Sequence, residues 1–231
     1  MTLELDHAKT IEFPLRGEWT VFNSPGERVP SHSTDYFGQR YAFDFSQLNE
    51  QGATPYHKPL WHHLLGLVRV EDCCAWGQPV YAPFAGEIVG VGDGWPDRQR
   101  LSFLPDAMRS HFFAPKATAA DYRPLTGNYV LLAGEPGVAL FAHLQCDSVA
   151  VSVGHQVEVG AMLGRVGNSG NSTLPHLRFQ LMDGRDPLQA KGIPCKFRTY
   201  QRSQADDHWE TIVEGIPGVM ETIRVESGML T

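Results

Sequence analysis

The chain has 231 residues, 42% of them hydrophobic, and its 19 Lys and Arg against 26 Asp and Glu give a formal net charge of −7. This apolar content is typical of a chain with a packed core and excludes a disordered one. The negative balance, without any basic run, excludes nucleic acid as the expected partner, because phosphate contacts need clustered Lys and Arg.

The start of the chain and its apolar stretches bear on where the protein resides. No stretch approaches 18 apolar residues, so we expect no membrane span and no membrane partner. Residues 1–13 lack the basic start and apolar core of a secretory signal, which predicts a cytoplasmic protein. The cysteines form no C-x-x-C pair, and we expect reduced thiols rather than a cysteine zinc site. They are Cys73, Cys74, Cys146 and Cys195.

Turn and strand signals alternate along most of the chain. Residues 77–92 read as turn, strand, turn and strand, and residues 128–133 and 138–143 predict a hairpin across Gly134-Glu135-Pro136-Gly137. The helical signals are weak: we expect helix within residues 99–120, where Pro105 and Pro115 limit it, and one turn near residues 59–67. Further strands are predicted at residues 149–153, 156–159, 162–166, 179–182, 210–213 and 221–225.

These elements predict an all-β fold, a curled antiparallel sheet forming a flattened barrel or sandwich with a helical insertion. We see no clean linker and expect a single domain over residues 1–231. Its core would span about residues 13–197, with an insertion at about 93–126 and a C-terminal extension at about 198–231.

The motif with the clearest chemical meaning runs from Gly167 to Gln180 and contains His176-Leu177-Arg178. In a strand, residues i and i+2 lie on one face, so His176 and Arg178 should point into the same site. An imidazole can bind zinc, whereas a guanidinium stays protonated and has no free lone pair. The stretch therefore combines one potential metal ligand with one cation.

Several further motifs precede this one in a specific order: Phe141-Ala142-His143-Leu144, then Gly154-His155-Gln156-Val157, with Tyr41-Ala42-Phe43-Asp44-Phe45 upstream. Over roughly residues 13–197 the chain resembles the lysostaphin/LytM family of zinc metallopeptidases, which includes peptidoglycan endopeptidases. The resemblance implies a site with three protein zinc ligands, a His, an Asp and the second His of an H-x-H motif. The fourth ligand would be a water made nucleophilic by the metal.

The resemblance assigns roles residue by residue. Asp44 matches the aspartate ligand, and His143 and His176 match the two catalytic histidines that do not bind the metal. Arg40 stands at the usual spacing for the first ligand, and His32, in a Ser-His segment, is the candidate in its place. Arg178 stands where the family has the last histidine ligand. His57, His62 and His63 form a cluster that remains an alternative source of a ligand.

Two functions therefore stay open. One is a non-catalytic or weakly active homologue that binds a peptide or peptidoglycan-like ligand. The other is an active zinc metalloendopeptidase with altered metal coordination. Because a buried carboxylate is costly without a partner, we predict that Arg178 forms an ion pair with Asp44, with His176 alongside, and that zinc occupancy is low.

Overall fold

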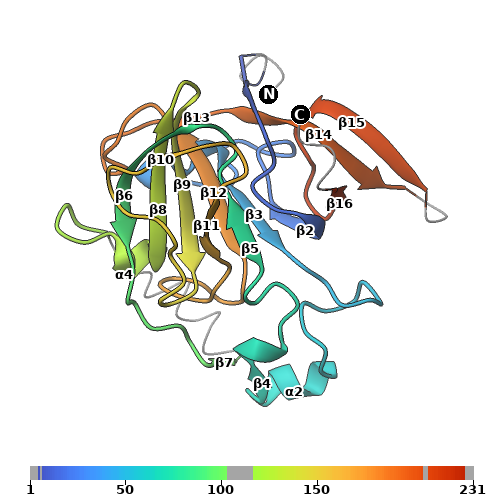
Figure 1. Cartoon of the computed structure of the whole chain (residues 1–231). Coiled ribbons are helices and arrows are strands. Elements are labelled where there is room, and N and C mark those ends of the chain that lie inside the picture. The colour runs from blue at the N-terminus through green and yellow to red at the C-terminus, as the bar shows by residue number, and fades with distance from the viewer. Residues whose placement is uncertain (1–4, 6, 103–116, 205–207, 227–231) are drawn as a thin grey trace.

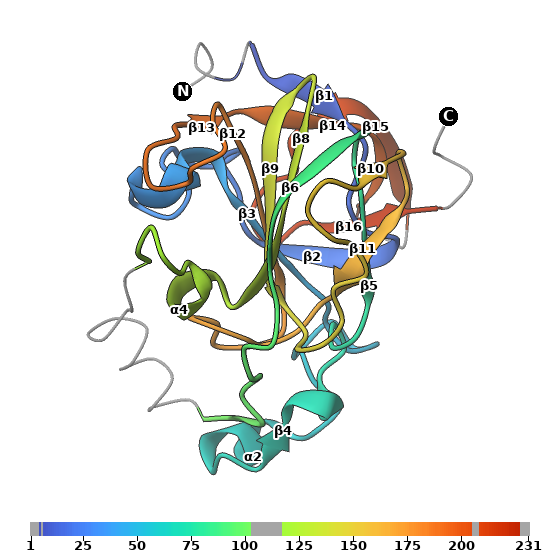
Figure 2. The same cartoon turned by 60° about the vertical axis from the view of Figure 1, so that its left-hand side comes forward.

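The computed structural model describes residues 5, 7–102, 117–204 and 208–226. Strands predominate there and the helices are short (Figures 1 and 2). No helix in these ranges is long and apolar enough to cross a membrane. The helical elements are η1 (Tyr36–Tyr41), α2 (Leu60–Leu64), η2 (Val70–Asp72) and α4 (Arg123–Thr126). The strands are β1 (Lys9–Ile11), β2 (Gly17–Asn23), β3 (Phe43–Ser46), β4 (Val68–Arg69), β5 (Pro79–Tyr81), β6 (Gly86–Gly92), β7 (Arg100–Leu101), β8 (Asn128–Gly134), β9 (Gly137–Leu144), β10 (Gln156–Val157), β11 (Met162–Arg165), β12 (Leu177–Met182), β13 (Gly192–Ile193), β14 (Cys195–Ser203), β15 (Trp209–Gly215) and β16 (Thr222–Val225).

One large sheet organises the molecule. Its strands follow the order β1-β14-β16-β2-β3-β12-β9-β8-β6-β10, with β13 beside β12 and β15 beside β14. Only the β1–β14 pair is parallel among the described strands. The expected all-β, antiparallel character is confirmed. The sheet is not closed into a barrel, because β1 and β10 end it without pairing with each other. The strands of residues 198–226 also belong to this sheet.

The predicted hairpin is present as β8 and β9, and the predicted helical turn near residue 60 is α2. The predicted strand at residues 149–153 is wrong, since no strand is present there: the Val149 amide donates to the Asp93 carboxylate, and the Ala150 amide alone donates to Leu163 on β11. The predicted helix at residues 99–120 lies mostly outside the described residues. At its start β7 pairs with β4, so this part is strand instead.

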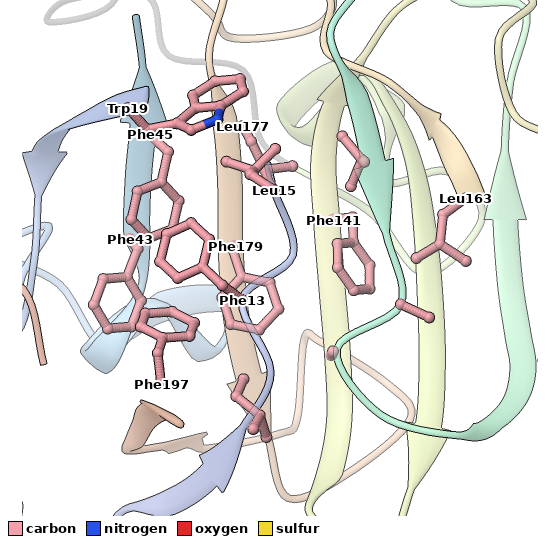
Figure 3. Close-up of a cluster of buried hydrophobic side chains, with 14 of the residues drawn as sticks. Phe13, Leu15, Trp19, Phe43, Phe45, Phe141, Leu163, Leu177, Phe179 and Phe197 are labelled. Atoms are coloured by element: carbon pink, nitrogen blue, oxygen red, sulfur yellow. The ribbon is translucent and has the colours of Figure 1, made fainter. Parts of the chain in front are cut away.

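Phenylalanines dominate the main core, on one face of the sheet (Figure 3). Phe43 and Phe45 on β3 stack with ring centroids 5.5 Å apart, and Phe179 on β12 packs beside them. Burying each such ring contributes about 1.5–3 kcal/mol. Since side chains alternate along a strand, the residues between these phenylalanines face the other side of the sheet. The core thereby determines which residues face the site.

Candidate functional site

Two neighbouring strands bring together the acid and the cation. On β3, Asp44 lies between two core phenylalanines, and on β12, Arg178 lies between two core residues. The antiparallel register makes Asp44 and Arg178 direct Cα partners. Both side chains therefore emerge on the same face and at the same level.

His143 reaches this face through an irregularity in β9. Strict alternation would place it on the side opposite to Ala142, the residue that pairs with Arg178. Its backbone instead adopts φ 63°, and the register of β8 and β9 shifts by one residue at this point. Such a bulge re-aims a side chain. As a result, the His143 ring lies 4.7 Å from the ring of His176, centroid to centroid.

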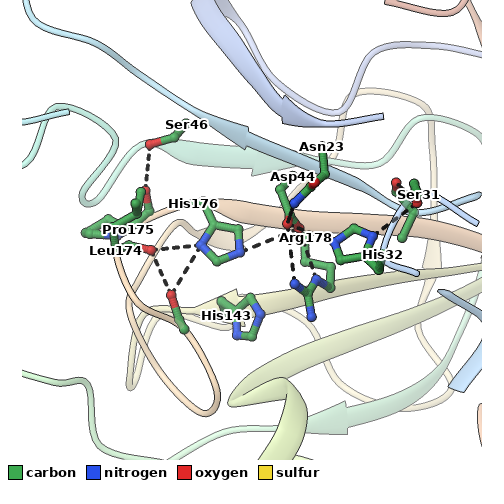
Figure 4. Close-up of polar contacts among 12 residues, drawn as sticks. Asn23, Ser31, His32, Asp44, Ser46, His143, Leu174, Pro175, His176 and Arg178 are labelled. Carbon is green, nitrogen blue, oxygen red and sulfur yellow. Dashed lines mark hydrogen bonds and ion pairs between the residues drawn. The ribbon is translucent and has the colours of Figure 1, made fainter. Parts of the chain in front are cut away.

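Arg178 binds both oxygens of the Asp44 carboxylate (Figure 4). Its Nε donates to Oδ1 at 3.0 Å and its Nη2 donates to Oδ2 at 3.3 Å. Nε2 of His176 lies 3.6 Å from Oδ1. The ion pair expected from the sequence is therefore present, with His176 beside it. Asp44 is only 5% exposed, so this pair compensates a buried charge.

Two more side chains contact the same carboxylate. Nε2 of His32 lies 2.8 Å from Asp44 Oδ2, and its Nδ1 lies 3.1 Å from the Ser31 hydroxyl. Asn23 on β2 donates its amide to Oδ2 at 2.7 Å. Sequence reasoning did not find Asn23. It lies opposite Asp44 only because β2 pairs with β3, and no local motif indicates that pairing.

The two histidines are held through their Nδ1 atoms. Nδ1 of His143 donates to the Ser169 carbonyl at 2.9 Å, and Nδ1 of His176 donates to the Leu174 carbonyl at 2.8 Å. The hydroxyl of Ser172 lies 3.2 Å from the same His176 nitrogen. A neutral imidazole that donates from Nδ1 carries a lone pair on Nε2. Both Nε2 atoms are buried and have no hydrogen-bond partner.

Charge and burial shift the pKa values in this cluster. Burial raises the pKa of Asp44, but the charge of the Arg178 guanidinium and the neighbouring His32 and His176 outweigh it and hold this pKa well below its ordinary value. Burial lowers the pKa of His143, and His176 and Arg178 lower it further. Burial also lowers the pKa of His176, against the effect of Asp44. Both lowered pKa values favour the neutral form of these rings.

The structure thus gathers His32, Asp44, His143, His176 and Arg178 into one cluster, although they come from distant parts of the sequence. Their catalytic and metal-binding roles remain predictions. Arg40, at the usual spacing for the first ligand, forms an ion pair with Asp35, in which its Nη1 lies 2.8 Å from Oδ1.

His57 and His63 of the other histidine cluster contact side chains outside the Asp44 cluster. His62 and His63 lie on α2, where His63 contacts Tyr56, and His57 contacts Cys74. Among the described residues, a single group of three His, Cys, Asp or Glu side chains has all its ligand atoms within 4.8 Å of one another. This group consists of Asp93, Cys146 and Asp147. None of the three α2-region histidines belongs to it.

These donors do not fit a zinc ion as the family binds it. Both Asp44 oxygens accept hydrogen bonds. Each accepts one from the Arg178 guanidinium, which cannot release its proton. Of the three ligand positions that the resemblance implies, His32 and Asp44 lie 2.8 Å apart, and the third is occupied by Arg178, which offers no lone pair. The cation at this position is the arginine itself.

Comparison with known proteins connects this arrangement to a family. The sequence model described as Peptidase family M23 matches residues 114–190, the stretch that contains His143, His176 and Arg178. The structure is similar to the catalytic domain of the antimicrobial peptidase lysostaphin from Staphylococcus simulans, with 22% identity over 66% of this chain and 74% of that chain, at a TM-score of 0.36.

Two further solved structures are similar. One is the M23 metalloprotease Pseudoalterin from the deep sea, with 11% identity over 89% of this chain and 86% of that chain, at a TM-score of 0.39. The other is a zinc-containing peptidase from Vibrio cholerae, with 18% identity over 80% of this chain and 38% of that chain, at a TM-score of 0.35.

The matched residues carry the ordered motifs from Phe141 to Gln180 that first suggested the resemblance. Residues 114–190 match Peptidase family M23, and the ordered motifs make the chain similar to the LytM/lysostaphin-like members of that family.

Proposed function

We propose that this protein is a LytM-like homologue that binds a peptide or peptidoglycan-like ligand and has lost zinc-dependent hydrolysis. The observation that carries the proposal is the ion pair in which Arg178 binds both oxygens of Asp44. In a buried site, this cation already compensates the carboxylate. A divalent metal would have to displace the guanidinium and would meet its fixed positive charge nearby.

The ligand class rests on the family, whose members include peptidases that act on cell-wall peptides. The site offers groups that suit an amide-bearing ligand. The Nε2 atoms of His143 and His176 are hydrogen-bond acceptors without a partner, and Arg178 has further N–H donors besides those used by Asp44. A peptide group presents both a donor and an acceptor, which these side chains could satisfy.

An active zinc metalloendopeptidase with altered coordination is the second candidate. The observation that favours it is the survival of His32, Asp44, His143 and His176 in one cluster, in which the Nε2 atoms of His143 and His176 have no hydrogen-bond partner. In this case His32 and Asp44 would hold the metal together with another nearby histidine. Metal content separates the two candidates.

The test compares the wild-type protein with Arg178→His, which removes the cation and recreates the H-x-H pattern. Arg165→His, at another strand arginine, is the matched control. After incubation with zinc and desalting, elemental analysis should find little zinc in the wild type and the control, and much more in Arg178→His. Stoichiometric zinc in the wild type would overturn the proposal and support the hydrolase.

The ligand is tested with soluble cell-wall muropeptides. Calorimetry should detect their binding to the wild type, while mass spectrometry should detect no cleaved product. Cleavage that a chelator abolishes would contradict the loss of hydrolysis. Absence of binding at millimolar muropeptide would instead contradict the ligand class.

A further inference from the structure

A segment outside the family motifs lies against the loop that holds the histidines. Asp97 forms an isolated antiparallel bridge with Ser169, and the Arg98 amide donates to the Asn168 carbonyl at 3.2 Å. The Arg98 guanidinium also donates to the Ser172 carbonyl. This segment is the described start of the insertion at residues 93–126, so the insertion contacts the loop directly.

The Asp97 carboxylate joins two separate parts of the chain. Its Oδ1 accepts a hydrogen bond from the Asn168 amide at 2.6 Å, and its Oδ2 accepts one from the Cys146 amide at 2.7 Å. Cys146 lies two residues after the end of β9, the strand that carries His143. Asn168 lies in the Gly167–Ser169 segment. One side chain thus ties the end of β9 to the loop beside it.

The two neighbours of Asn168 hold His143. The Gly167 amide donates to the His143 carbonyl at 2.9 Å, and the Ser169 carbonyl accepts from Nδ1 of His143 at 2.9 Å. The φ of 63° at His143 is unfavourable for a residue other than glycine. Such a conformation persists only where its surroundings impose it. The position of Asn168 therefore bears on both the backbone and the ring of His143.

We propose that Asp97 is a positioning residue for His143. By holding the Asn168 and Cys146 amides, it places the Ser169 carbonyl so that His143 stays in the Nδ1–H tautomer, with the Nε2 lone pair kept in the site. This inference concerns the orientation of one ring. It stands independently of whether the protein binds zinc or hydrolyses a peptide.

A role in stability alone would give a different result from a positioning role. Loss of a loop tie lowers the free energy of unfolding but leaves the tautomer of a distant ring unchanged. Loss of the Asp97 clamp should release the Ser169 carbonyl and allow His143 to exchange between tautomers. The imidazole nitrogen signals report this difference directly.

The experiment is long-range proton–nitrogen NMR on the ¹⁵N-labelled full chain, with His143 assigned through the loss of its signals in His143→Gln. In the wild type, Nδ1 should appear protonated and Nε2 unprotonated. In Asp97→Asn, which retains only one acceptor oxygen, both signals should shift toward the average of the two tautomers. An unchanged His143 spectrum in folded Asp97→Asn would overturn the proposal.

Asp93→Asn is the matched control. The Asp93 carboxylate accepts from the Asp147 and Val149 amides of the same loop region, but its bonds do not involve residues 167–169. It should leave the His143 signals in place, and an equal shift in both variants would overturn a specific role for Asp97. If Asp97→Asn does not fold, two measurements on the wild-type protein still test the proposal. A His143 protonated on Nε2, or fast hydrogen exchange of the Asn168 amide, would refute the clamp.

Discussion

Arg178 and Asp44 are direct partners across β12 and β3, and the guanidinium binds both carboxylate oxygens at 3.0 and 3.3 Å. By its resemblance to the family, the chain would have a metal ligand at the position of this arginine, and the structure shows a permanent cation there. This single relationship gives the site its chemistry. It also determines how the protein should respond to mutation and pH.

Removing the cation should destabilise the protein strongly. Arg178→Ala leaves Asp44 buried without its main counter-charge, and breaking a buried pair in this way costs about 3–5 kcal/mol. Urea unfolding at neutral pH measures the free energy of unfolding. The control is Arg185→Ala, because Arg185 lies 3.8 Å from Glu87 in an exposed pair and should contribute under about 1 kcal/mol. Equal losses in both variants would contradict the structural role of Arg178.

Stability should fall on mild acidification. The pKa values of His143 and His176 are lowered in the folded protein, so below their ordinary value of about 6.5 the unfolded chain binds more protons than the folded one. The lowered pKa of Asp44 adds a loss at lower pH, below about 4, as the unfolded carboxyl takes up its proton first.

Unfolding free energies at pH 7.5, 6 and 5 would check this dependence. His143→Gln should flatten part of the slope, whereas His155→Gln, at an exposed histidine, should leave the slope unchanged. A wild type equally stable from pH 7.5 to pH 5 would argue against neutral, buried histidines.

Asn23→Asp tests the neutral donor on the same carboxylate. The substitution keeps the shape of the side chain but replaces the amide, which donates to Asp44 Oδ2 at 2.7 Å, by a second acceptor. The lost hydrogen bond to a charged group is worth about 1.5–3 kcal/mol, and the repulsion between the two carboxylates adds to it, so we expect at least this loss. Gln47→Glu is the control, because its amide bonds the Glu18 carbonyl at an exposed position. A thermal melt that is unchanged in Asn23→Asp would show that this bond contributes little.

Gly167→Ala tests the close approach of two backbones beside His143. A Cβ at Gly167 would lie 2.4 Å from the Cα of Gln145, a distance that forces the segments apart. We expect a loss of about 1–3 kcal/mol from this overpacking. At Gly184 a Cβ would lie 3.5 Å from the Cβ of Ala190, so Gly184→Ala should be tolerated. Urea unfolding of both variants distinguishes this steric account from a general effect of replacing glycine.

Part of the site was predictable from the sequence. The alternation in Phe43-Asp44-Phe45 and in Leu177-Arg178-Phe179 places two core residues around each polar one, and the motif order assigned both stretches to one site. The ion pair followed from the cost of an unpaired buried carboxylate. The hairpin of β8 and β9 was equally readable, because a glycine-rich turn lies between two apolar runs.

Other features depended on contacts that no local pattern specifies. Asn23 reaches Asp44 through the pairing of β2 with β3, and β16 inserts between β14 and β2 from the far end of the sequence. The bulge at His143 and the Asp97 clamp on Asn168 likewise depend on how the insertion lies against the loop. At residues 149–153, where a strand was expected, the Val149 amide donates to the distant Asp93 carboxylate.

By itself, the sequence determined which face of each strand is polar, which residue carries the permanent positive charge, and the family to which the motifs belong. Side-chain alternation has a period of two residues and needs no distant partner, so it can be read locally. Only the tertiary structure decided that Arg178 lies against Asp44 in register and that His143 turns onto the same face. Strand order and register are set by long-range pairing and core packing, which join residues far apart along the chain.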